Sequence, residues 1–264
     1  MPAISPDGSG IVYFSMRPGQ EDLWLQPIRN KKPSGTPKRL TGLGGISSHP
    51  AISPDGRWIV CYRIFMNKRE IWTLPLSGES AIQFIHDPPQ ATDPSWSPDG
   101  SRIAFVAQDA VWVAPVKDGR LAGKVQRIAA GIFSGEAPAW SLDSKTVAFV
   151  GTANERSEIW LVPADGSSPA FKLTNGAAVR CIRWDAINKG ILASGSWGEN
   201  RVTLRNVNPE SGASFPFWPE VEFGSGTSPE LGFFDITTDG GELAFSKVEL
   251  QGHIWISTAT HSAF

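Results

Sequence analysis

The chain has 264 residues, of which 41% are hydrophobic and 10% aromatic, enough for the core of a single all-β domain. Its 24 basic and 26 acidic side chains give a net charge of −2, and no cluster of Lys and Arg marks one face, which argues against a nucleic-acid partner. No apolar run is long enough to span a bilayer, so we expect no membrane insertion.

One pattern recurs six times along the chain: an apolar residue, a tight turn, a short apolar strand, a loop, and a second strand built around an aromatic residue. The clearest copies run from Ala51 to Trp72 and from Ser95 to Trp112. The turn positions are Asp7, Asp55, Asp99, Asp143, Ile187 and Asp239. Repeats of roughly 40 to 50 residues with about four strands each have the length of a propeller blade. The sequence therefore predicts an all-β fold, a six-bladed β-propeller with about four antiparallel strands per blade.

The repeat divides the chain into a single propeller domain spanning residues 1–264. The expected blades are 1–45, 46–90, 91–134, 135–177, 178–230 and 231–264. Outer fourth strands are expected at 38–41, 81–85, 125–129, 171–174 and 219–223. Few residues follow Trp255, so the last blade either lacks its outer strand or forms one from the tail. We expect a monomer, with blade six offering an open edge for association with another chain.

Two repeated features have a structural explanation and a functional alternative. Ser-Pro-Asp-Gly, as at 53–56, is the signature of a type I turn, which we favour over metal-binding or catalytic aspartates. Tryptophan recurs in the third strand, and we favour packing between blades over a ligand-stacking platform. The third-strand tryptophans are Trp24, Trp72, Trp112, Trp160 and Trp255. Cys61 and Cys181 lie too far apart in the repeat for a disulfide and are expected to be buried.

These turn and tryptophan motifs resemble the TolB-like, WD40-like family of Ser-Pro-Asp-Gly propellers. The resemblance covers the chain, most strongly residues 1–175, whereas 184–190 lacks the turn motif and blade six keeps only Thr238-Asp239-Gly240. It implies a bacterial protein in the periplasm or another extracytoplasmic compartment. It also implies that the chain is the C-terminal part of a larger protein, in which an upstream segment supplies the missing outer strand.

Recognition is expected at the channel mouth, because the connections into the inner strands vary in charge while the turns on the opposite face repeat. We call this the channel-mouth face, and the opposite one the turn face. The residues expected at the connections are His49, Asp93, Glu136 and Arg180. Those expected on the same face by alignment are Arg17, Arg63, Gln108, Arg156, Trp197 and Lys247. The alternative is that these are ordinary polar residues around a solvated channel.

No catalytic constellation is visible. The segment 194–198 has Ser where the first Gly of a nucleophile elbow is required, and the four histidines lack metal-ligand spacing. Asp93 and Glu136 could form a carboxylate pair, but the sequence does not give their separation. We therefore expect no enzyme activity, no cofactor and no metal.

Three functions remain open. The first is a non-catalytic scaffold that binds a protein or peptide partner through the channel-mouth face. The second is the substrate-gating propeller of a prolyl-oligopeptidase-type hydrolase that lacks its catalytic domain. The third is a propeller that binds a small molecule or glycan. The aromatic-rich stretch 208–232 is interpreted as an irregular outer strand with a loop over the blade, rather than a partner contact.

Overall fold

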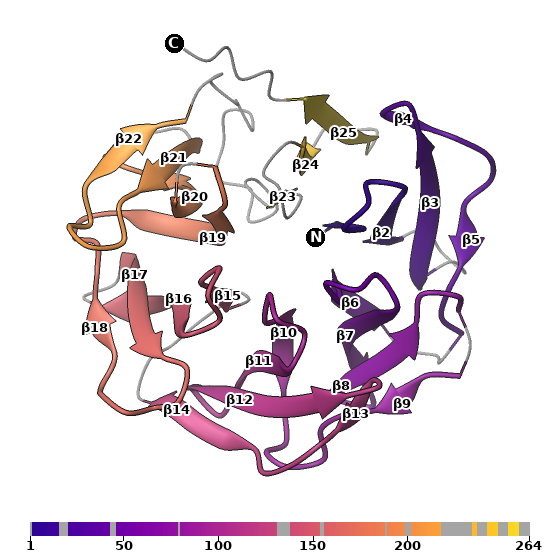
Figure 1. Ribbon diagram of the computed structural model, residues 1–264, viewed down its shortest axis with the longest axis horizontal. Helices are drawn as coiled ribbons and strands as arrows, with labels where there is room; N and C mark the ends of the chain where they lie inside the picture. The colour runs from indigo at the N-terminus through magenta and orange to yellow at the C-terminus, as the bar shows by residue number, and fades with distance from the viewer. Residues whose placement is uncertain are drawn as a thin grey trace.

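The chain folds into a ring of antiparallel sheets. The computed structural model describes residues 2–15, 21–42, 46–78, 80–130, 138–153, 156–187, 189–198, 202–217, 234–236, 242–247 and 253–258. Within these residues there are six sheets and no helix. The sheets stand side by side around a central axis, and the first strand of each lies nearest that axis (Figure 1).

The strands pair in chain order within each sheet, except that the last strand of each five-stranded sheet pairs with the third strand. The first sheet contains β1 (Ala3–Ile4), β2 (Gly10–Phe14), β3 (Leu23–Arg29), β4 (Lys32–Pro33) and β5 (Lys38–Arg39). The second contains β6 (Ile46–Ile52), β7 (Trp58–Phe65), β8 (Lys68–Pro75) and β9 (Ile82–Gln83). The third contains β10 (Thr92–Trp96), β11 (Arg102–Ala107), β12 (Ala110–Lys117), β13 (Arg120–Leu121) and β14 (Gln126–Ala130).

The remaining three sheets follow the same order. The fourth contains β15 (Ala139–Trp140), β16 (Thr146–Ala153), β17 (Arg156–Pro163) and β18 (Phe171–Lys172). The fifth contains β19 (Ala178–Asp185), β20 (Gly190–Ser196), β21 (Thr203–Val207) and β22 (Ser214–Pro216). The last contains β23 (Phe234–Ile236), β24 (Glu242–Lys247) and β25 (His253–Thr258).

The predicted all-β propeller with antiparallel sheets is confirmed, but six four-stranded blades are not. Five sheets are complete blades of four or five strands, and the last sheet has three strands over the described residues. This last sheet arises from the weakest copy of the repeat. Residues 259–264, where a tail strand was considered, lie outside the described residues.

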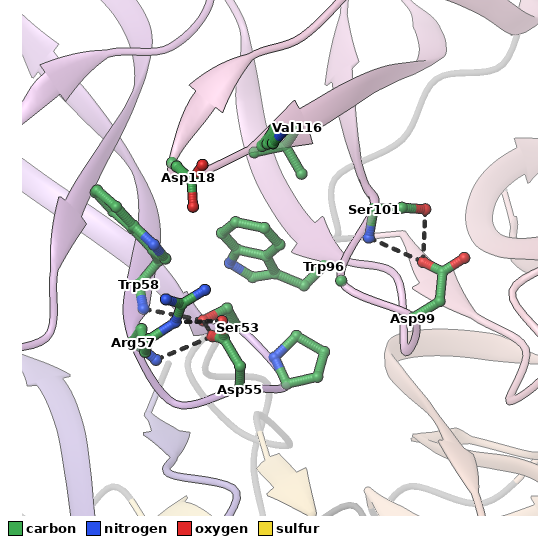
Figure 2. A pocket seen from close by; sticks show the side chains of 13 residues that line it. Ser53, Asp55, Arg57, Trp58, Trp96, Asp99, Ser101, Val116 and Asp118 are labelled. Carbon is green, nitrogen blue, oxygen red and sulfur yellow. Dashed lines mark hydrogen bonds and ion pairs between the residues drawn. The ribbon is translucent and has the colours of Figure 1, made fainter.

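The Ser-Pro-Asp-Gly segments form the tight turns that the sequence predicts. In the turn after β6, the Gly56 amide donates to Ser53 O at 2.8 Å and Ser53 Oγ donates to Asp55 Oδ1 at 2.5 Å. The Arg57 amide donates to the same carboxylate oxygen at 3.0 Å (Figure 2). Equivalent bonds from serine to aspartate occur at Asp7, Asp99 and Asp143. The turn aspartates therefore act as local hydrogen-bond acceptors that close each turn.

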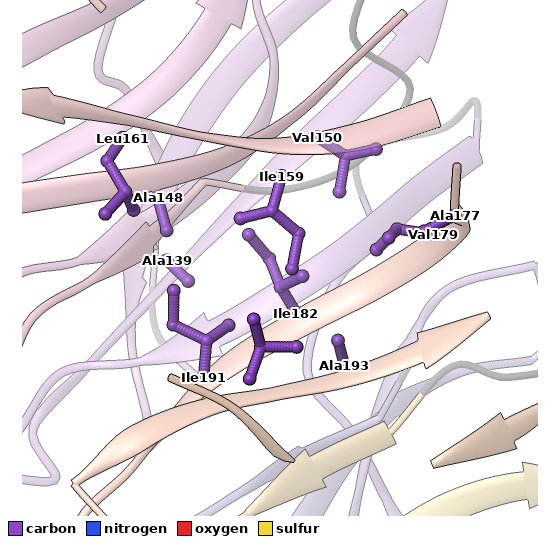
Figure 3. Close-up of a cluster of buried hydrophobic side chains, with 11 residues drawn as sticks. Ala139, Ala148, Val150, Ile159, Leu161, Ala177, Val179, Ile182, Ile191 and Ala193 are labelled. Atoms are coloured by element: carbon purple, nitrogen blue, oxygen red, sulfur yellow. The ribbon is translucent and has the colours of Figure 1, made fainter. Parts of the chain in front are cut away.

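The core consists of clusters between neighbouring sheets, because one sheet cannot bury both of its apolar faces. Between the fourth and fifth sheets, Ile159 and Leu161 of β17 pack with Ile182 of β19 and Ile191 of β20 (Figure 3). Four similar clusters join the other consecutive sheets. Burying each such side chain stabilises the fold by about 1.5–3 kcal/mol.

Tryptophans contribute to these interfaces from two strand positions. In the third strands, Trp72, Trp112 and Trp160 are half-buried against the clusters, which confirms their predicted packing role. A second set lies at the ends of the inner strands. There, Trp140 Nε1 donates to Ser95 O at 3.2 Å and Trp184 Nε1 donates to Ala139 O at 3.1 Å. Each of these two indoles thus bonds to the inner strand of the preceding sheet.

The outer strands largely match the expected segments, with one correction in the fifth sheet. Its outer strand is β22, at 214–216, rather than 219–223, which lies outside the described residues. Phe217 is buried and its amide donates to Leu204 O at 3.0 Å, whereas Phe215 is exposed. Only one aromatic of this pair fits the core, so the described part of the stretch forms an irregular outer strand.

Asp235 of β23 links the beginning of the chain to its later sheets. Its Oδ2 accepts a hydrogen bond from the Ile4 amide of β1 at 3.0 Å. Its Oδ1 accepts one from Arg183 Nε of β19 at 2.9 Å. One carboxylate therefore bridges three inner strands where the ring closes (Figure 1).

Both cysteines are buried and are not joined by a disulfide, as predicted. Burial raises the pKa of the Cys61 thiol to about 12. Cys61 therefore stays protonated and behaves as a small apolar residue of the core.

Candidate binding face at the channel mouth

The inner strands carry an irregularity on the channel-mouth side. The pairing register shifts between Ser48 and Ala51, between Thr92 and Ser95, and between Val179 and Cys181. Each shift inserts unpaired backbone into the strand, as a β-bulge does. The bulges re-aim side chains at the same level of three blades, which is where the sequence predicts recognition.

His49 and Asp93 occupy equivalent positions in two of these bulges. Each stands six residues before its turn aspartate, and each has a left-handed backbone, with φ of 48° and 53°. A non-glycine residue in this conformation costs of order 1–3 kcal/mol unless its surroundings hold it there. Such strain is often found at functional sites, so these two residues are the centre of the candidate face.

The structure brings His49 and Asp93 together across the boundary between the second and third sheets. His49 Nε2 lies 3.7 Å from Asp93 Oδ1, and the two side chains are only 17% and 12% exposed. The His49 ring stacks on Tyr62 of β7 with a centroid distance of 5.1 Å. Ser48 Oγ lies 3.1 Å from His49 Nδ1. The imidazole is therefore held in one orientation.

Burial shifts both groups toward their neutral forms. It lowers the pKa of His49 to about 3, and the positive charge of Arg183 lowers it further. It raises the pKa of Asp93 to about 6, against the opposing effects of Thr92 and Arg69. At pH 7 the site therefore holds a neutral imidazole beside a carboxylate that is close to its titration range.

Arg63 is fixed on the neighbouring strand β7. It is 9% exposed, and its guanidinium carbon lies 4.3 Å from the Phe65 ring centroid and 5.5 Å from the Trp72 ring. Arg63 Nη1 lies 3.8 Å from Glu70 Oε2. These contacts position the guanidinium by cation–π and ionic attraction. Arg63 is thus held in a fixed position on the channel-mouth face.

The hairpin tip between β7 and β8 rises beside this cluster. Gln90 holds the tip, because its side-chain amide donates to Asn67 O at 3.2 Å and its Oε1 accepts from the Arg69 amide at 3.1 Å. At the tip, Met66 is 80% exposed and has a φ of 47°. The braced hairpin thus presents an apolar side chain on the channel-mouth face.

The structure also describes four of the other predicted residues. Arg180 is half-buried in β19, and Gln108 is exposed at the β11–β12 hairpin with a φ of 51°. Arg156 is exposed and donates from Nη1 to Gly176 O at 2.8 Å. Trp197 is half-buried, with the Arg205 guanidinium 5.5 Å from its ring. The expected carboxylate pair cannot be placed, because Glu136 lies outside the described residues.

The positions of two further predicted residues, Lys247 and Arg17, cannot be assigned to the face. Lys247 is the last residue of β24, and its side chain is not described. Arg17 lies outside the described residues, as Glu136 does.

The sequence prediction missed Arg183 and Asp235. Both lie two residues before the position of the turn serine, where the first four units have a small residue: Ala3, Ala51, Ser95 and Ala139. Charged residues at a position that is otherwise small were the signal that could have identified them. They pair at 2.9 Å, with each side chain 18% exposed. An ion pair between the fifth and last sheets therefore also lies at the inner strands.

Two other features are absent from the described part of the chain. No group of three or more His, Cys, Asp or Glu side chains there is arranged to hold a metal ion. Over the same residues, no helix has the length and apolar character needed to cross a membrane.

Known proteins share both sequence and fold with this chain. The family described as "TolB beta propeller domain" matches residues 1–111. "Tricorn protease homolog 1" of Streptomyces coelicolor is 31% identical over 103 residues, which are 39% of this chain. The match spans 9% of that relative's length.

Solved structures extend the likeness to most of the chain. A putative TolB from Agrobacterium tumefaciens has a TM-score of 0.69 and 20% identity, and covers 86% of this chain and 83% of that one. TolB from Acinetobacter baumannii has a TM-score of 0.64 and 20% identity, with 84% and 54% covered. An oligogalacturonate lyase from Vibrio parahaemolyticus has a TM-score of 0.61 and 13% identity, with 97% and 73% covered. At these identities the structural likeness concerns the fold alone.

Proposed function

Because this chain is a TolB-like β-propeller, we propose that it is a non-catalytic scaffold that binds a protein or peptide through its channel-mouth face. The observation that carries the proposal is the pair of strained, buried residues His49 and Asp93 at equivalent bulges. The turn face offers a contrast, since its aspartates are used within their own turns.

The chemistry of the pair suits recognition of a peptide. A carboxylate such as Asp93 accepts hydrogen bonds from backbone amides or basic side chains, and a neutral imidazole both donates and accepts. The exposed Met66 adds an adaptable apolar contact on the same face. A few fixed polar groups beside apolar surface are typical of specific interfaces.

The proposal is tested by photo-crosslinking in the host. A photoreactive amino acid replaces Gln108, exposed on the channel-mouth face, or Leu142, 45% exposed on the turn face. We expect a defined partner to be captured from position 108 and not from position 142. Equal capture from both positions would contradict the assignment of the binding face.

Affinity measurements with the purified partner then identify the residues involved. Asp93→Asn is expected to weaken binding by about 10-fold or more, as loss of a charge-assisted hydrogen bond does. The matched control is Asp118→Asn, which changes an exposed aspartate of the turn face with a φ of 47°. An unchanged affinity in Asp93→Asn would remove this residue from the interface.

One observation favours substrate gating as a second candidate. The 31% identity over 103 residues is to a protein named as a tricorn protease homologue. In this proposal, the propeller would control which substrates reach an attached peptidase domain. Two observations together would support gating. A hydrolase domain would be encoded beside this propeller, and its peptide turnover would be lost when Met66 at the mouth is changed to a larger side chain. Turnover unaffected by that change would count against it.

A further inference from the structure

A pocket lies on the turn face, away from the proposed protein-binding surface. Its volume is about 500 Å³, and it opens between the second and third sheets (Figure 2). It is lined by residues of the Ser53–Trp58 turn, by Trp96 and the 99–101 turn, and by Val116–Gly119. Small-molecule sites typically range from roughly 300 to 1,000 Å³. The pocket is thus large enough for a small ligand.

Trp96 breaks a pattern of the repeat inside this pocket. The indoles at the equivalent positions, Trp140 and Trp184, donate to carbonyl groups of the preceding sheet. Trp96 Nε1 is buried and has no hydrogen-bond partner among the described residues, and its ring lies among the lining residues (Figure 2). A buried donor without a partner costs about 1–3 kcal/mol. Between the second and third sheets, Trp96 therefore lines the floor of the pocket and does not donate a hydrogen bond to the preceding sheet.

Trp58 forms a second aromatic wall, and Gly119 makes room for it. A Cβ atom at Gly119 would lie 2.3 Å from the Trp58 ring, and Gly119 has a φ of 67°. Thr73 Oγ1 fixes this turn by donating to Gly119 O at 2.6 Å. The close approach of backbone to indole thus keeps Trp58 at the pocket edge.

The charged groups around the pocket are of both signs. Its lining includes Asp55, Asp99, Asp118, Arg57 and Lys117. The hydrogen bonds within their turns lower the pKa of Asp55 and Asp99, so both are carboxylates near neutral pH. A strongly anionic ligand would meet three carboxylates, and a strongly cationic one would meet two cations. The balance favours a neutral ligand that both donates and accepts hydrogen bonds.

We propose that this pocket binds a neutral sugar residue. The indoles of Trp58 and Trp96 pack against the C–H face of the sugar ring, as amphipathic aromatics pack against apolar surface. Asp118, which is exposed, accepts hydrogen bonds from its hydroxyl groups, and Lys117 donates to them. The site is independent of the channel-mouth face, so it stands whether or not that face binds a protein.

The test is a titration of the full chain with glucose, N-acetylglucosamine and maltose, followed by NMR of ¹⁵N-labelled tryptophan. We expect saturable shifts of the Trp58 and Trp96 indole signals, with dissociation constants in the millimolar range. Trp96→Phe and Asp118→Asn should each weaken binding roughly 2- to 10-fold. Asn suits the left-handed backbone of position 118, where φ is 47°, so the second variant keeps the turn.

Trp140→Phe is the matched control, because its indole is already bonded to the preceding sheet. The affinity of the Trp140→Phe variant for the sugar should equal that of the unchanged protein. The proposal is overturned if no sugar gives saturable shifts, or if Trp140→Phe weakens binding as much as Trp96→Phe. It is also overturned if tetramethylammonium or inorganic phosphate saturates the site and the sugars do not.

Discussion

Replacing Asp93 by Asn is expected to make the free energy of unfolding depend strongly on pH between about pH 4 and pH 6. Burial raises the pKa of Asp93 from 3.8 to about 6 in the folded protein. Its contribution to stability is therefore fully present below pH 3.8 and is lost as the pH rises through 6. At about 1.4 kcal/mol per unit of pKa, this loss amounts to about 3 kcal/mol.

His49 acts in the opposite direction over the same range. Burial lowers its pKa from 6.5 to about 3, so its contribution is present above pH 6.5 and is lost as the pH falls toward 3. Between about pH 4 and pH 6 the folded protein releases a proton from His49 and takes one up on Asp93, relative to the unfolded chain. The two slopes cancel there, so this pair adds almost no pH dependence to the stability of the unchanged protein.

Urea unfolding at a series of pH values, followed by tryptophan fluorescence, measures these profiles. Asp93→Asn leaves only the His49 slope, so its stability should fall by about 3 kcal/mol as the pH drops from 6 to 4. His49→Gln leaves only the Asp93 slope, so the stability of this variant should rise by a similar amount over the same drop from pH 6 to pH 4. The exposed Asp109→Asn should follow the unchanged protein. A profile of Asp93→Asn parallel to that of the unchanged protein would refute the reasoning.

Three further changes probe the scaffold by the same unfolding measurement. Gly119→Ala should cost about 1–3 kcal/mol, because it adds a methyl group against an indole ring at a positive φ; no loss would mean that the turn moves freely. Phe149→Ala should cost about 3–5 kcal/mol by leaving a cavity, whereas the exposed Phe215→Ala should change stability by less than about 0.5 kcal/mol. Asp235→Asn should cost about 1–3 kcal/mol by weakening the bridge to Arg183, and an unchanged midpoint would show that the ring closes without it.

The fold was largely predictable because its signals are local and repeated. A turn such as Ser53–Gly56 closes through hydrogen bonds among its own residues, so its sequence alone specifies its geometry. The outer strand at 214–216 was misplaced because this unit lacks the regular spacing. Short outer strands depend on pairing with their neighbours, and their own residues specify them weakly.

The sequence predicted where the channel-mouth residues lie, but it did not predict how buried they are or which of them meet. The sequence placed His49 and Asp93 at the mouth as candidates for recognition, but it did not indicate that they are buried and lie close together. Their burial and mutual approach depend on bulges and on the packing of two separate blades, which no local pattern encodes. The pocket on the turn face was missed for the same reason, since Trp96 and Trp58 come from different repeats and meet only in the ring.

The recurring bulge also has a consequence for protein engineering. Its extra backbone lies at the same level in three blades, outside the ladder bonds that hold the sheets together. The less buried of these positions, His49 and Arg180, can be varied in combination while the repeated turns remain constant. The ring is therefore a natural display framework from which binders for new targets could be selected.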